Sequence, residues 1–290
     1  MPGRTPIVVG VDPDPAQRGA LAWAADAADL RRLPLLLVLA QNLPTPGDRP
    51  SGGRPSWEEW NEALHATGDQ ALRDAVAFVE SRYPRVRVSG LLAEGHPAWV
   101  LREQSRHAAQ VVLGSWHLSA RRELFTSAAV ALPVIAHSPC PVVVVPESGH
   151  IVRQPPYVVV GVDGSPQSAA AVDVAIEEAA LRGASLRALW VWHAPRLGTP
   201  DDGALQECRR LLSETVSGRA AGHPGVDLRH EVLSGHPVEV LAKASEDALA
   251  VVVGTRGHGG FTGMLLGSVG QGLLHHARCP VIAVPHAHAR

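Results

Sequence analysis

The sequence predicts an α/β protein made of two tandem, doubly wound, mostly parallel sheets with about five strands each. Three observations support this prediction. The chain has 290 residues, which suits two domains because common domains have roughly 100–150 residues. Several short segments recur in the same order in both halves. Apolar runs without polar alternation also alternate with helix-like stretches, as expected for strands buried on both faces of a parallel sheet.

An internal repeat relates the two halves. IVVGVD at Ile7–Asp12 matches VVVGVD at Val158–Asp163, 151 residues further along the chain. Three later matches lie 139 or 140 residues apart: Glu94–Leu101 with Ser234–Leu241, Gln110–Ser115 with Ala250–Thr255, and Cys140–Pro146 with Cys279–Pro285. Four matches in one order indicate a duplication. The change in spacing places extra residues of the first copy in a segment rich in Pro, Gly and Ser, Thr45–Ser56, which we expect to be a surface loop.

Each copy has the same expected order of strands and helices, the helices forming the crossovers of parallel strand pairs. In the first copy the strands are Ile7–Val11, Leu35–Ala40, Val86–Ala93, Gln110–Leu113 and Val142–Val145. In the second copy they are Val158–Val162, Leu186–Trp192, Val226–Leu233, Ala250–Val253 and Val281–Val284. The long helices are Ala16–Arg32, Trp57–Arg82, Gln167–Arg182 and Ala204–Ala221. The predicted domains are residues 1–147 and 157–290, with a Pro- and Gly-containing linker at 148–156.

Composition and charge argue against several classes of protein. The formal net charge is −2 and no long run of Lys or Arg occurs, so we expect no nucleic-acid binding. Apolar runs such as Leu35–Ala40 are far shorter than the roughly 20 residues that span a bilayer, and no signal peptide is evident, so we expect a cytoplasmic protein without a membrane partner. The three cysteines lack zinc-type spacing and His275 and His276 point to different sides of a helix, so no metal site is predicted.

A glycine-rich loop follows the fourth strand of the second copy. Gly254-Thr255-Arg256-Gly257 comes directly after the strand, and nine residues separate Gly257 from the pair Gly267-Ser268, which opens a helix. Glycines allow backbone N–H groups to surround an anion, and a helix N-terminus favours phosphate. The chain contains neither GxxxxGK[ST] nor, after a first strand, GxGxxG. The loop therefore predicts a phosphate site of another kind.

These glycines, with VVVGVDGS at Val158–Ser165 and HARCPVIAVP at His276–Pro285, resemble the ATP-binding signature of the universal stress protein family over essentially the whole chain. The resemblance implies a flavodoxin-like three-layer sandwich of the adenine nucleotide alpha hydrolase type in each copy. It implies that Asp163 and Val191 contact adenosine, and that Gly254 and Gly257 contact ribose and phosphate. It further implies phosphate contacts from Gly267, Ser268 and Val269, with ATP as ligand, with or without Mg²⁺, and a homodimer formed through the last strands.

The first copy departs from the signature. It keeps Asp12 and Gly114, but His117 replaces the second glycine and Ala128-Ala129 replace the Gly-Ser pair. A Cβ narrows the approach to the backbone, and Ala offers no hydroxyl at the helix start. We therefore expect the first copy to bind ATP weakly or not at all.

Three functions stay open from the sequence. The first is an ATP-binding stress-response regulator; the second is an enzyme that hydrolyses ATP slowly or acts on an adenylated small molecule; the third is a scaffold that binds no nucleotide. No catalytic residue is predicted, because Ser268 with His258 or His275 lacks an acid behind the histidine. Asp163 has an alternative role as a turn residue before its helix. The last strands are expected to pair with each other or across a dimer interface, because unpaired apolar edges favour aggregation.

Overall fold

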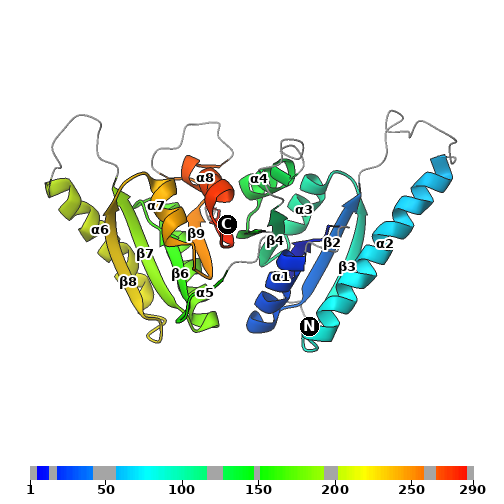
Figure 1. The fold of residues 1–290 in the computed structure, drawn as a ribbon, viewed down its shortest axis with the longest axis horizontal. Coiled ribbons are helices and arrows are strands. Elements are labelled where there is room, and N and C mark those ends of the chain that lie inside the picture. Colours follow the sequence, from blue (N-terminus) through cyan, green and yellow to red (C-terminus); the bar gives the residue numbers. More distant parts are fainter. Residues whose placement is uncertain are drawn as a thin grey trace. The chain divides into compact units, whose positions relative to one another are not determined.

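The computed structural model describes residues 5–12, 18–41, 57–115, 127–146, 151–192, 202–257 and 266–285. The chain divides into two compact units, Met1–Gly114 and Ser115–Arg290. In each unit the strands lie side by side and helices pack on them (Figure 1). The predicted α/β class and the mostly parallel strand pairing are confirmed.

The first unit has strand order β3-β2-β1-β4, and its strand pairs are parallel. Its elements are β1 (Ile7–Gly10), α1 (Arg18–Arg31), β2 (Leu35–Gln41), α2 (Trp57–Arg82), β3 (Val88–Glu94), α3 (Pro97–Ser105) and β4 (Gln110–Ser115).

The second unit begins with the end of the first sequence copy, α4 (Ser127–His137) and β5 (Val142–Pro146). The second copy follows, with β6 (Tyr157–Gly161), α5 (Pro166–Arg182), β7 (Ser185–Trp192), α6 (Asp202–Ala220), β8 (Leu228–Ser234), α7 (Pro237–Ala244), β9 (Ala250–Gly254), α8 (Ser268–His276) and β10 (Val281–Val284). The strand order is β8-β7-β6-β9-β10-β5.

One strand pair in the second unit is antiparallel. β10 pairs with β5, and Ile282 lies opposite Val143. Of the two arrangements expected for the last strands, the structure has the pairing with each other. β10 also pairs in parallel with β9, so a strand lies on each side of it.

The strand order of the second copy creates a switch point between β6 and β9. The chain runs outward from β6 to β7 and β8, and then returns to place β9 on the other side of β6. In sheets of this kind, the loops after the two central strands leave in opposite directions and open a crevice at their carboxyl ends. The elements that follow β6 and β9 are therefore the ones that border this crevice.

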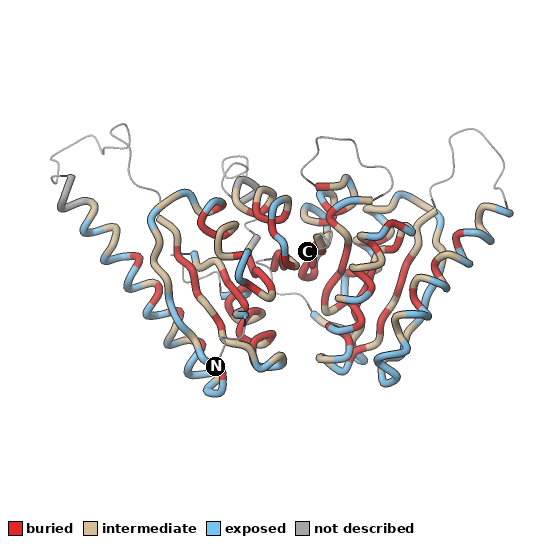
Figure 2. Tube along the Cα trace, turned by 180° about the vertical axis from the view of Figure 1, so that it is seen from behind, coloured by how far each residue is buried: buried red, intermediate tan, exposed pale blue. Residues whose placement is uncertain are grey.

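Valine-rich strands form the core of each sheet. Val158, Val159 and Val160 of β6 have no exposed surface, and neither do Val251 and Val252 of β9. Figure 2 shows buried residues along the strands and on the helix faces that pack against them. Burying one such side chain stabilises the fold by about 1.5–3 kcal/mol.

Two strands begin later than their apolar sequence predicts. β3 begins at Val88 and β8 at Leu228, whereas Val86 and Val226 belong to the preceding turns. The Val86 N–H donates to the Tyr83 carbonyl at 2.9 Å and the Val226 N–H to the His223 carbonyl at 3.1 Å. Val86 is nevertheless buried, so an apolar residue at this position indicates burial and does not indicate strand pairing.

Among the described residues, no helix combines the length and hydropathy needed to cross a membrane.

Candidate functional site

Asp163 organises the turn between β6 and α5. Its Oδ1 accepts hydrogen bonds from the Ser165 N–H at 3.0 Å and from the Ser165 hydroxyl at 2.6 Å. The Ser165 Oγ in turn accepts from the Ser168 N–H at 3.1 Å and so caps α5. Asp163 therefore has the turn role that its sequence neighbours allow, and this bond network fixes the position of its carboxylate.

The carboxylate of Asp163 lies against Gly257 of the glycine-rich loop. A Cβ added to Gly257 would collide with Asp163 Oδ2. The end of β6 and the loop after β9 therefore meet at this point, as their places at the switch point require. A side chain at position 257 would displace the carboxylate.

Gly254 is required by helix packing. A Cβ at this residue would lie 2.9 Å from the Gln167 Cβ and 3.0 Å from the Gln167 carbonyl carbon. The missing side chain thus allows the first turn of α5 to approach the end of β9. This contact brings Gln167, which the sequence did not single out, to the edge of the glycine loop.

The N-terminus of α8 offers unpaired backbone donors. Gly267 is the N-cap and provides no side-chain cap. Its own N–H donates to the Thr255 carbonyl at 2.9 Å, and the first helical bond runs from the Gln271 N–H to the Gly267 carbonyl at 2.9 Å. Within the described part of the chain, the amides of Ser268, Val269 and Gly270 have no hydrogen-bond partner.

These three amides form the positive end of the α8 dipole, where an anion is favoured. Gly270 was not among the residues that the sequence indicated. Its position alone could have indicated it, because Gly270 is the third residue of α8 and the N-cap residue Gly267 has no side chain to bond its amide.

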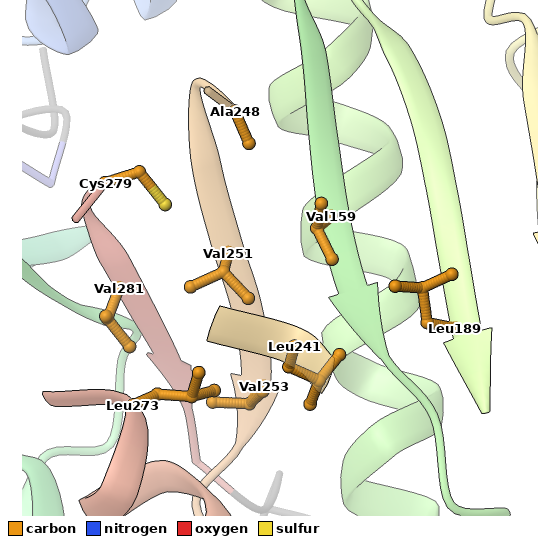
Figure 3. Packing of buried hydrophobic residues seen from close by; sticks show 9 residues of the cluster. All are labelled: Val159, Leu189, Leu241, Ala248, Val251, Val253, Leu273, Cys279 and Val281. Carbon is orange, nitrogen blue, oxygen red and sulfur yellow. The ribbon is translucent and has the colours of Figure 1, made fainter. Parts of the chain in front are cut away.

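α8 is held in place by the core beneath the site. Leu273 of α8 is fully buried and belongs to a cluster with Leu241 of α7 and Val253 of β9 (Figure 3). Val269 packs against the same cluster. Its side chain is thus engaged with the core, and its backbone amide is the group it offers at the helix start.

Val191 lies near the carboxyl end of β7, beyond the point where β7 pairs with β6. The register of β7 with β6 ends at Leu189, whose carbonyl accepts from the Val162 N–H at 2.9 Å. The register with β8 continues to Trp192. Since backbone groups alternate along a strand, the N–H and C=O of Val191 point in the same direction as those of Leu189, into the space beyond the end of β6.

In the structure, Asp163 lies against Gly257. Gly267 is hydrogen-bonded to Thr255, the residue after Gly254. Val191 stands apart from this group, because β6 lies between β7 and β9. Neighbouring strands are about 4.8 Å apart, so the two ends of the site are separated by roughly 10 Å. Such a site suits an elongated ligand that has a hydrogen-bonding end and an anionic end.

The first copy has part of the same arrangement. The Val11 N–H donates to the Val38 carbonyl at 2.8 Å, so Ala40 occupies the place of Val191. Asp12 is exposed after β1, and Gly114 lies near the end of β4. His117 and the side chains of Ala128 and Ala129 lie outside the described residues, as does His258 of the second copy.

Cys279, two residues before β10, is fully buried. Burial raises the pKa of the Cys279 thiol to about 11, so it is protonated at neutral pH. The described residues contain no group of three or more His, Cys, Asp or Glu side chains placed to hold a metal ion.

The fold defines a tandem α/β protein whose second copy has a topological switch point between β6 and β9. The sequence model of the universal stress protein family matches residues 3–146 and 157–285. The chain is 34% identical over 286 residues to a universal stress protein of Mycobacterium bovis, covering 95% of each protein. It belongs to the universal stress protein family, as a tandem two-domain member.

Solved structures agree with this assignment at the level of the fold. The crystal structure of a universal stress protein from Archaeoglobus fulgidus superimposes with a TM-score of 0.73 at 18% identity, covering 97% of both chains. Another universal stress protein, solved in complex with cAMP, is 27% identical over 44% of this chain, with a TM-score of 0.38.

Proposed function

We propose that this protein is an ATP-binding regulator of the stress response, with the nucleotide held mainly by the second copy. The observation that supports this most is the uncapped start of α8 beside the glycine-rich loop. Three backbone amides there have no partner among the described residues, and a phosphate group supplies the acceptors that they lack.

The proposed contacts follow the order of the site. Val191 binds the adenine through its backbone, Asp163 and Gly254 border the ribose, and the backbone of Gly257, beside the Asp163 carboxylate, contacts the adjoining phosphate. Gly267 leaves the helix start open, and the amides of Ser268 and Val269 bind the remaining phosphates. ATP enters this site with or without Mg²⁺.

Regulation in this proposal does not require a chemical step. His275 of α8 is exposed, and no carboxylate among the described residues bonds to its ring. Binding alone changes the loop after β9, and thereby the surface that a partner protein meets.

The direct test begins with the protein as purified from cells. Denaturing it and separating the released small molecules by chromatography identifies any bound nucleotide. The proposal expects an adenine nucleotide in the extract and, after its removal, calorimetric binding of ATP but not of GTP. A protein that carries no nucleotide and gives no heat with ATP is a scaffold, and the proposal is then wrong.

A second assay separates a regulator from an enzyme. The protein is incubated with ATP, and ADP and AMP are followed over hours. A regulator gives no more product than the Gly267→Asp variant, whereas product formed only by the wild type assigns the site to hydrolysis.

We further propose that the two domains span residues 1–147 and 157–290, that residues 148–156 link them, and that the protein is cytoplasmic. We also propose a homodimer formed through the last strands. Because β10 already has a strand on each side, two chains would have to exchange β5 to pair through these strands. Light scattering on the purified protein measures its mass and decides between an exchanged dimer and a monomer.

A further inference from the structure

Gln167 lies at the site without a structural partner. It is the second residue of α5, partly buried, and its side chain makes no hydrogen bond in the described part of the chain. Ser165 caps the helix and Pro166 begins it, so the first turn is stabilised without Gln167. The amide of Gln167 therefore has both a donor and an acceptor available for a ligand.

Two polar side chains border the same glycine turn. The Cβ of Gln167 lies against Gly254, so its side chain begins at the glycine turn, and the carboxylate of Asp163 lies against Gly257. One offers a carboxylate and the other an amide, from the same loop and helix start. A pair of neighbouring hydroxyl groups matches this combination, because a carboxylate accepts from a hydroxyl and an amide both donates to and accepts from one.

The geometry points to Gln167 as a specificity-determining residue that recognises the ribose hydroxyls of the bound nucleotide, so that the site selects ribonucleotides over deoxyribonucleotides. This inference rests on the proposed function. A site built to bond a hydroxyl rejects the analogue that lacks it, because its own polar group is then left unpaired. The first copy has Ala16 at the equivalent position, so this selection belongs to the second copy.

The test compares three ligands, ATP, 2′-deoxy-ATP and 3′-deoxy-ATP, by calorimetry on the full chain. The wild type is expected to bind ATP about fivefold more tightly than one of the deoxy analogues, the effect of one neutral hydrogen bond. Gln167→Met keeps the length of the side chain and removes its hydrogen bonds. It should weaken ATP binding by the same factor and leave binding of that analogue unchanged. Gln206→Met, at an exposed position of α6, is the matched control and should change none of the affinities.

Each outcome bears on the inference. If Gln167→Met weakens all three ligands equally, Gln167 serves packing and the inference is wrong. The same holds if the variant changes nothing. Gln167→Ala, which suits a helix, replaces Gln167→Met if the latter lowers the melting temperature. If the inference fails while the wild type still binds ATP, the proposed function is unaffected. If the wild type binds no ATP, both the inference and the proposed function are wrong.

Discussion

The glycines of the second copy serve different physical purposes. Gly254 makes room for α5, Gly257 makes room for the Asp163 carboxylate, and Gly267 leaves a helix start uncapped. Gly267 has φ −61° and ψ 153°, a conformation open to any residue, so its backbone does not require glycine. The clustering of glycines was visible in the sequence. Their separate purposes depend on residues from α5 and β6, which sequence spacing does not reveal.

Gly257→Ala tests the contact with Asp163. The added Cβ displaces the carboxylate, so we expect ATP affinity to fall by about tenfold or more, the effect of one lost charge-assisted hydrogen bond. The free energy of unfolding should change little, because Gly257 lies in a loop at the edge of the core. Calorimetry and urea denaturation measure the two effects.

Gly218→Ala is the control for this change. Apart from the neighbouring residues and the backbone of α6 itself, no atom of the described residues lies within 4 Å of a Cβ at this position, so the variant should gain about 0.5–1 kcal/mol of stability and bind ATP as the wild type does. Normal ATP affinity in Gly257→Ala would show that the loop and Asp163 do not form the site.

At the scale of helices and strands, the sequence predicts the elements well where hydrophobic periodicity is long. The helix Trp57–Arg82 begins and ends at the predicted residues. Prediction failed at the starts of β3 and β8, where the N–H groups of Val86 and Val226 close turns instead of joining the strands. It could not find Gln167 or Gly270 either, since their relevance comes from contact with β9 and from the absence of a cap on α8.

Gly267→Asp separates the stability of α8 from its proposed function. An aspartate at the N-cap accepts from the free amides and complements the dipole, so we expect about 0.5 kcal/mol of added stability. The same carboxylate occupies the proposed phosphate position and repels the ligand. ATP affinity should therefore fall by about a hundredfold, the loss of one or two strong hydrogen bonds.

Gly267→Asn is the neutral counterpart. It caps the helix without a charge, so its loss of ATP affinity should be smaller than that of Gly267→Asp. Unchanged ATP binding by the aspartate variant would exclude the start of α8 as the phosphate site.

The pairing of β5 with β10 gives another prediction at this scale. Val143 and Ile282 lie opposite each other and have no exposed surface. Val143→Asp places an unpaired charge in this pairing, so we expect a loss of more than about 3 kcal/mol and aggregation through the freed edge of β10. Ile282→Val, as the control, should cost only about 0.5–1.5 kcal/mol. A Val143→Asp protein with the native mass in light scattering and an unchanged urea midpoint would contradict this role of the pair.

At the scale of the whole molecule, the compact units do not follow the duplication. β5 ends the first copy in sequence, but it belongs to the second compact unit and pairs with β10. The second copy alone would therefore expose one edge of β10. Binding by the two copies is for this reason best compared in the full chain, with a substitution in one copy at a time.

The duplication itself was plain from four matched segments, and so was the divergence of the first copy, in which Ala128-Ala129 stand in place of Gly267-Ser268. The pairing of β5 with β10 was only one of two alternatives, because a short valine-rich strand carries no information about which strand it will pair with.

The most direct test of the account is a calorimetric titration of the full chain with ATP. The wild type should bind a single ATP per chain. Asp12→Ala in the first copy should leave that binding unchanged, and Gly267→Asp in the second copy should remove it. Two ATP molecules per chain, or binding that is lost with Asp12→Ala and kept with Gly267→Asp, would contradict the claim that the second copy holds the nucleotide.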